Sequence, residues 1–334
     1  MNFLNRFHLK RFVIDSWFFF KGNSLGKGGL PCVPILTYHS IGDSDNPFFP
    51  ALPSTVFENQ IRYLSKRFRL ITLQSLMKDL SSGVVPSGSL VLTFDDGYKD
   101  NFTIAFPILK RYGAVGTIFL TTECIGSGVP LWTDVLGALF QETSSKSLVL
   151  KFGNSETFSW TSREDKLLVF HKMKSLIKTL PEDRKTELLA DIKEQLGNDS
   201  SFDWSQRMLN WDDARLLHEA GIEIGGHTAS HPILSQVSEE RVYRELYDSK
   251  NSIEDAIQAP VTSLAYPNGT MNDFNEKVQK IAQKIGYHSA CTTVDGVVVA
   301  SSPPFALPRL YTTEFSVSRL AWLLSRNMKK VFSR

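Results

Sequence analysis

Two pairs of residues in this sequence have the types and spacing needed to bind a metal ion and to move a proton. Asp95 and Asp96 follow the apolar run "SLVLTF", and His227 and His231 lie four residues apart just past "IEI". Four-residue spacing places both imidazoles on one side of a helical turn. Two histidines and one carboxylate leave coordination positions open for water and substrate. The pattern indicates a site for a divalent ion such as zinc, iron, manganese or cobalt.

Each of these motifs also has a simpler explanation. Histidines at this spacing are commonly surface or capping groups, and Asp-Asp-Gly commonly marks a turn. A third predicted strand, however, also ends in unusual polar residues, since Tyr266, Pro267 and Asn268 lie past "SL". The carboxyl ends of parallel strands converge on one face. Three polar strand ends therefore favour one shared active site.

The elements that must position these residues alternate between strands and helices. Strands are expected over 33–39, 89–97, 115–122, 222–227, 263–267 and 287–293, and helices over 53–68, 98–113, 210–221, 238–257 and 273–286. This alternation predicts a parallel sheet covered by helices, either a barrel or a doubly wound sheet. Residues 131 to 210 break the rhythm, with two helical stretches around Pro181. We interpret residues of about 141–205 as a helical insertion in one catalytic domain that spans 32–315.

Composition excludes some classes of protein. The chain has 334 residues, of which 42% are hydrophobic, and 37 basic residues against 35 acidic ones leave a net charge of +2. This balance does not indicate a nucleic-acid partner. The three cysteines form neither a disulfide framework nor a zinc-ligand pattern. Oligomeric state is not readable from the sequence.

The two ends of the chain are basic and aromatic. Residues 1–31 include "KRFVIDSWFFFKG", which is interrupted by Asp15 and too short to span a bilayer. Two interpretations remain: a helix packed on the main domain, or a peripheral membrane contact. Residues 316–334 are expected to form a C-terminal helix and basic tail. With no clear signal peptide or transmembrane span, a cytoplasmic or membrane-peripheral location is expected.

Three motifs together resemble a known family. "TFDDG", "HTASH" and "AYPNG" occur in the order found in the NodB-homology polysaccharide deacetylases, carbohydrate esterase family 4, and the resemblance covers roughly residues 33 to 312. It implies a deformed (β/α) barrel that hydrolyses the acetamide of an N-acetylated sugar. It also implies a divalent metal ion, with zinc preferred over cobalt, manganese, nickel or iron. Carried over by position, Asp96, His227 and His231 are the metal ligands and Asp95 is the general base.

The same resemblance bears on three further roles. The backbone N–H of Tyr266, beside Pro267 and Asn268, is expected to stabilise the oxyanion. Many members carry a late histidine as the general acid, but "FALPRL" at 305–310 has none. His39 in "LTYHSIG" resembles an early histidine of the branch that includes poly-N-acetylglucosamine deacetylases, where it is thought to act as the acid. The alternative is a structural histidine at a strand end.

An arginine that orients the base is also missing from "SLAYPNG". Arg309 could replace it by pairing with Asp95 from another strand, or it could be a surface residue. Trp132, Asp134 and Trp211 either line a sugar-binding groove or pack in the core.

The leading hypothesis is a hydrolase of linear amides, a metal-dependent polysaccharide deacetylase that removes N-acetyl groups from a polysaccharide, an oligosaccharide or a lipid-linked glycan. One alternative is a deformylase or amidase acting on a lipid-linked amino sugar. Another is a catalytically silent barrel that only binds glycan, because the late histidine and the motif-three arginine are absent.

Overall fold

A ring of parallel strands forms the centre of the molecule in the computed structural model, which describes residues 30–151, 155–197, 202–312 and 316–331. Around the ring the strand order is β1-β10-β9-β8-β7-β4-β3, and β3 pairs with β1 to close it. Every pairing in this sheet is parallel, and β2 (Arg69–Ile71) adds only to the start of β3. The ring strands are β1 (Ile35–Tyr38), β3 (Ser89–Phe94), β4 (Thr117–Leu120), β7 (Glu223–Gly226), β8 (Ser263–Ala265), β9 (Ser289–Asp295) and β10 (Leu307–Tyr311).

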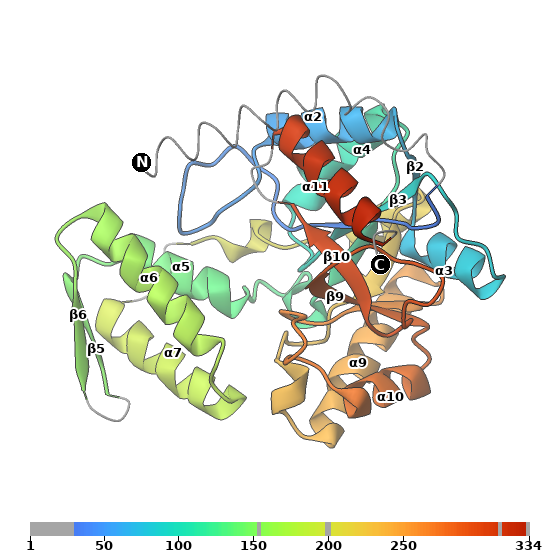
Figure 1. Ribbon diagram of the computed structural model, residues 1–334. Helices are drawn as coiled ribbons and strands as arrows, with labels where there is room; N and C mark the ends of the chain where they lie inside the picture. The colour runs from blue at the N-terminus through green and yellow to red at the C-terminus, as the bar shows by residue number, and fades with distance from the viewer. Residues whose placement is uncertain (1–29, 152–154, 198–201, 313–315, 332–334) are drawn as a thin grey trace.

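Helices connect the strands and cover the outside of the barrel (Figure 1). The side chains of β1 and β3 are buried throughout, as expected for strands with helices on one side and the barrel interior on the other. C-terminal helix α11 packs against α2. The covering helices are α2 (Ser54–Ser65), α3 (Leu73–Ser81), α4 (Phe106–Arg111) after a π-helical turn (Asn101–Ala105), α8 (Trp211–Glu219), α9 (Glu239–Ile257), α10 (Glu276–Ile285) and α11 (Val317–Lys330).

The insertion lies at one side of the barrel and has a hydrophobic core of its own (Figure 1). It contains α5 (Trp132–Glu142), a hairpin of β5 (Ser147–Leu150) and β6 (Glu156–Ser159), α6 (Arg163–Ile177) and α7 (Glu182–Leu196). Phe48 and Phe49, from the loop after β1, join this core. The insertion is therefore tied to the barrel by apolar packing as well as by the chain itself.

The predicted deformed barrel is confirmed, and so are the strands and helices expected from the sequence. The insertion contains the two expected helices and also an antiparallel hairpin of β5 and β6 that was not predicted. Pro181 separates the two long helices as expected, since it is the residue before α7. The N-terminal segment, with its predicted helix or membrane contact, lies outside the described residues apart from its last two. Among the described helices, none combines the length and apolar character needed to cross a bilayer.

Gly225 in β7 generates a prediction, because the barrel leaves no room for a side chain there. A Cβ at this position would lie 2.6 Å from a ring carbon of Phe119 and 2.8 Å from the backbone oxygen of Ser263. We expect Gly225→Ala to lower the free energy of unfolding by about 1–3 kcal/mol, measured by urea denaturation. In the control Gly42→Ala, the nearest atom to the new Cβ is 3.8 Å away, and the change should stay within about 0.5 kcal/mol. Equal effects of the two changes would contradict this packing.

Candidate active site

The predicted site residues gather at the carboxyl ends of the barrel strands. Asp95 and Asp96 follow β3, His39 follows β1, and His227 and His231 follow β7. All five line one pocket of about 390 Å³. Parallel closure of the ring explains this, because it brings every strand's carboxyl end to the same rim.

Asp96, His227 and His231 form the one group among the described residues whose donor atoms could hold a metal ion. Oδ1 of Asp96 lies 3.5 Å from Nε2 of His227 and 3.5 Å from Nε2 of His231. Two donors bound to one tetrahedral zinc ion at about 2.1 Å would be about 3.4 Å apart, so the spacing fits. Nδ1 of His227 lies 2.7 Å from the carbonyl oxygen of Ala265, which can only accept. The proton is thus on Nδ1, and the Nε2 lone pair is free for a metal.

The electrostatics of these three groups also suit a cation. Burial, and next the charge of Asp95, raises the pKa of Asp96 to about 7. Burial lowers the pKa of His227 and lowers that of His231 well below its ordinary value. Neutral imidazoles are the form that binds metal, and a buried carboxylate without a cation is costly to ionise. The donor set therefore fits a divalent ion on geometry and on charge.

Asp95 has a different partner. Arg309 in β10 donates from Nη1 to Oδ1 and from Nη2 to Oδ2, both at 2.7 Å. Its remaining donors reach Thr93 at 3.1 Å and the carbonyl oxygen of Thr292 at 2.7 Å. Burial is the largest influence and alone would raise the pKa of Asp95. The charge of Arg309, the neighbouring histidines and the hydrogen bonds from Arg309 together outweigh it and hold that pKa well below its usual range. Arg309 was expected either to pair with Asp95 or to be a surface residue. It pairs with Asp95, and its side chain is only 1% exposed.

His39 also lies near Asp95. Its Nε2 is 4.0 Å from Oδ2 of Asp95, beyond a direct hydrogen bond, and its ring meets Tyr311 edge-on at 5.7 Å between centroids. Burial is the largest cause of a lowered pKa at His39, and the charge of Asp95 opposes it. The side chain is still 35% exposed, so it can reach a ligand in the pocket.

The expected role of the Tyr266 N–H is wrong. That group donates to the carbonyl oxygen of Cys291 at 3.1 Å, which continues the ladder between β8 and β9. The Tyr266 hydroxyl donates to Phe305, and the side chain is buried. Pro267 has no N–H, and within the described residues the N–H of Asn268 makes no hydrogen bond. Asn268 also lines the pocket, so it replaces Tyr266 as the candidate donor.

Backbone strain is concentrated at this rim. The described residues include five non-glycine positions with positive φ, and four of them are Asp96, Thr228, His231 and Asn268. Such conformations cost about 1–3 kcal/mol each and persist where the surrounding structure fixes them. Here the strain sets the directions of two candidate ligands and of the candidate oxyanion donor.

The remaining wall of the pocket comes largely from the insertion. Trp132 and Asp134 line the pocket, which agrees with the predicted groove. Arg207 donates a hydrogen bond to Asp134 at 2.8 Å. Trp211 instead packs against the main core. Lys174 and Lys178, which were not predicted, also line the pocket. The four-residue spacing of these two lysines is visible in the sequence. The sequence does not show which face of helix α6 meets the barrel.

Comparisons with known proteins agree with this fold and site. The family described as Polysaccharide deacetylase matches residues 82–290, so the chain belongs to that family. Its members are hydrolases that act on amide carbon–nitrogen bonds.

Two curated relatives were found. "Putative polysaccharide deacetylase YxkH" of Bacillus subtilis (strain 168) is 25% identical over 280 residues, which cover 83% of this chain and 70% of the relative. The poly-beta-1,6-N-acetyl-D-glucosamine N-deacetylase of Staphylococcus epidermidis is 36% identical over 72 residues, which cover 21% of this chain and 25% of the relative.

Solved structures share the fold. The Streptococcus pyogenes deacetylase PplD, in complex with acetate, superposes with a TM-score of 0.59 at 19% identity and covers 88% of this chain and 98% of its own. IcaB from Ammonifex degensii gives a TM-score of 0.56 at 15% identity, covering 88% and 97%.

The ligand geometry predicts one metal ion per chain, lost when a histidine is removed. We expect His227→Ala to lower the bound zinc from about one per chain to near zero, because two donors rarely hold zinc in water. Elemental analysis after dialysis measures this. His288→Ala is the control, since His288 is exposed and does not line the pocket. Stoichiometric zinc in the His227→Ala protein would place the metal elsewhere.

The buried pair predicts strong coupling between Arg309 and Asp95. Arg309→Met should cost about 3–5 kcal/mol of unfolding free energy, because it leaves a buried carboxylate without a partner. Adding Asp95→Asn should recover part of that loss, which a double-mutant cycle by chemical denaturation measures. The exposed pair of Arg244 and Glu240, at 3.9 Å, gives the control Arg244→Met, expected within about 0.5 kcal/mol. If the losses of unfolding free energy in the two single variants simply add in the double variant, the coupling is refuted.

Proposed function

We propose that this protein removes N-acetyl groups from an N-acetylated glycan by hydrolysis, with a divalent ion held by Asp96, His227 and His231. One observation carries the proposal: two adjacent carboxylates share a pocket but have separate partners. Asp96 lies among neutral histidines, and Asp95 lies against Arg309. The names of the S. epidermidis relative and of a de-N-acetylase from Aggregatibacter actinomycetemcomitans, with a TM-score of 0.58 at 15% identity, support this reaction class.

Zinc is the ion we propose, because two imidazole nitrogens and one carboxylate are a common catalytic zinc set. Cobalt, manganese, nickel and iron accept the same donors. When bound, such an ion lowers the pKa of a coordinated water and polarises a carbonyl group.

Asp95 is the residue we propose as general base. Its carboxylate stays ionised because of Arg309, and its neighbour Asp96 is engaged in the ligand set. Arg309 is a positioning residue, since its bidentate contact fixes the plane of the Asp95 carboxylate. Asp95 would take the proton of the attacking water as the tetrahedral intermediate forms.

The leaving amine and the developing oxyanion need donors of their own. His39, close to Asp95 in the pocket, is the proposed general acid. An imidazole with a lowered pKa is a strong acid once protonated, which favours transfer to the amine. The N–H of Asn268 is the proposed oxyanion donor from the protein, because Asn268 lines the pocket and this N–H makes no hydrogen bond to any described residue.

The division of labour between the two carboxylates gives the decisive experiment. Asp95→Asn should keep the metal and lower the rate of acetate release from N-acetylglucosamine oligomers by about 10²–10⁴-fold, because only the base is lost. Asp96→Asn should lose both metal and rate. Acetate release and bound metal are measured on the same samples.

Two outcomes would contradict the proposal. A metal-loaded wild-type protein that leaves every acetylated glycan intact would exclude the substrate class. An Asp95→Asn protein with unchanged rate would exclude the base.

A further inference from the structure

Helix α6 of the insertion carries a row of cations on one face. Arg163, Lys166 and Lys174 lie on the helix, and Lys178 is the residue that ends it. Their separations of three, eight and four residues keep them on one side of a helix with 3.6 residues per turn. At 1.5 Å per residue, this basic row is about 22 Å long. Phe170, at the middle of the same face, is buried.

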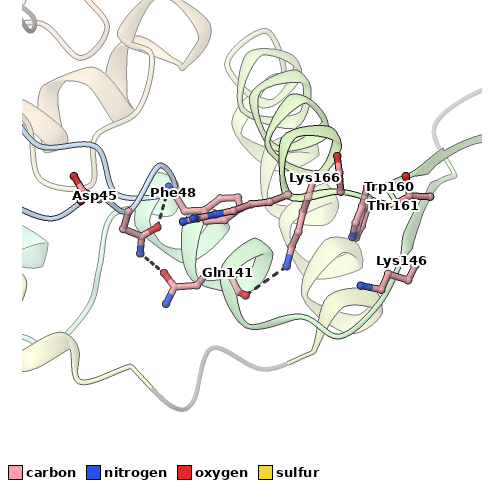
Figure 2. Close-up of a pocket in the computed structure, with 10 residues that line it drawn as sticks. Asp45, Phe48, Gln141, Lys146, Trp160, Thr161 and Lys166 are labelled. Carbon is pink, nitrogen blue, oxygen red and sulfur yellow. Dashed lines mark hydrogen bonds between the residues drawn. The ribbon is translucent and has the colours of Figure 1, made fainter.

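The basic row connects two cavities. Arg163 and Lys166 line an open outer cavity of about 690 Å³, and Lys174 and Lys178 line the catalytic pocket. Phe48 lines both cavities and packs on Phe170 with 5.3 Å between ring centroids. In Figure 2, Lys166 reaches across the outer cavity towards Gln141. A ligand along α6 would thus pass from the outer cavity over Phe48 to the catalytic rim.

In the described part of the chain none of these four cations forms an ion pair within 4.0 Å, although Asp134 and Asp96 act on Lys174, and Glu142 on Lys166, from a greater distance. Lys166 donates only to the carbonyl oxygens of Gln141 and Thr143, at 3.4 and 3.2 Å. The carboxylates of the catalytic pocket are already engaged. Arg309 pairs with Asp95, Arg207 pairs with Asp134, and Asp96 lies in the candidate ligand set. The outer cavity holds one carboxylate, Asp45, against Lys146, Arg163 and Lys166, so positive charge is in excess along α6.

Helix electrostatics alone do not explain the row. Lysines near a helix C-terminus interact favourably with the helix dipole, which would account for Lys174 and Lys178. Arg163, however, is the first residue of α6, where the dipole disfavours a cation. Lys166 lies in the second turn. A common ligand along the whole face accounts for all four positions.

We infer that the basic row binds anionic groups of the substrate, so that this site acts on an acidic glycan bearing phosphodiester or carboxylate groups. The inference rests on the proposed function. The acetamide lies in the catalytic pocket, Lys174 and Lys178 bind the nearest anion, and Arg163 and Lys166 bind one further along. Hydroxyl and amide side chains in the outer cavity, Asn46, Gln141 and Ser162 among them, suit sugar hydroxyls. A net charge of +2 over the whole chain speaks against a nucleic-acid ligand.

The activity experiment compares glycans of equal length that differ in charge. Acetate release is measured on a neutral N-acetylglucosamine oligomer, on one with phosphodiester groups and on one with carboxylates. We expect the wild type to favour an acidic oligomer by about tenfold in kcat/KM, mainly through KM, and added salt to reduce this preference. In Lys174→Met/Lys178→Met the ratio of acidic to neutral kcat/KM should fall to about one. The better of the two acidic oligomers identifies the anion.

Lys172→Met is the matched control. Lys172 lies on the same helix but pairs with Glu156 at 3.0 Å and lines neither cavity. It should keep the wild-type ratio. Equal kcat/KM on acidic and neutral oligomers in the wild type, or an equal change of the ratio in the control, would overturn the inference.

A binding experiment separates this inference from the proposed function. Metal-loaded Asp95→Asn protein, with and without the Lys174→Met/Lys178→Met change, is titrated with the same oligomers by calorimetry. Tighter binding of an acidic oligomer that depends on the two lysines supports the basic row even if no glycan is deacetylated. Equal binding of neutral and acidic oligomers overturns it. Duplex DNA and anionic vesicles are titrated as comparison ligands. If the two lysines affect binding of these ligands but not of the acidic oligomers, the inference is also overturned.

Discussion

The site depends on how two adjacent buried carboxylates are neutralised. Asp95 and Asp96 are 2% and 7% exposed, and neighbouring negative charges at such burial would disfavour each other's ionisation. The fold supplies a guanidinium for the first and a set of neutral imidazoles, suited to a cation, for the second. Both neutralising groups come from strands that are far from β3 in the sequence, because Arg309 lies in β10 and the histidines follow β7. Closure of the ring through β1 and β3 is what brings β10 to the base.

The rim is held rigidly enough to keep an unfavourable backbone. The positive φ angles of Asp96, Thr228 and His231 are each tied by hydrogen bonds to their surroundings. The carbonyl of Asp96 accepts from Thr121, that of Thr228 accepts from Thr122, and the N–H of His231 donates to the Thr228 hydroxyl. These bonds join the segments after β3, β4 and β7. Strain at the ligands is thus offset by the sheet that carries them, which keeps the donor atoms preorganised.

Residue types and spacing were enough to predict the rim but not its hydrogen bonds. The polar ends of three strands identified Asp95, Asp96, His227 and His231, because a parallel sheet leaves few ways to arrange them. The donor at the third strand end was assigned to the wrong residue, because the Tyr266 N–H is used by a ladder whose register depends on β9. The hairpin of β5 and β6 was missed because each strand has only four residues and neither "SLVL" nor "ETFS" alternates polar and apolar residues. Lys174 and Lys178 were missed because only tertiary packing turns their face towards the pocket.

The barrel and the insertion divide the site between chemistry and selection. Every candidate ligand, base, acid and oxyanion donor lies on or directly after a barrel strand, whereas the insertion adds only wall residues and cations. The two parts have separate hydrophobic cores, and the insertion's core includes Phe48 and Phe49 from the loop after β1. The walls that meet the rest of the glycan can therefore differ in charge or shape while the donor atoms at the rim stay fixed. A fold built this way can change its substrate without rebuilding its reaction centre.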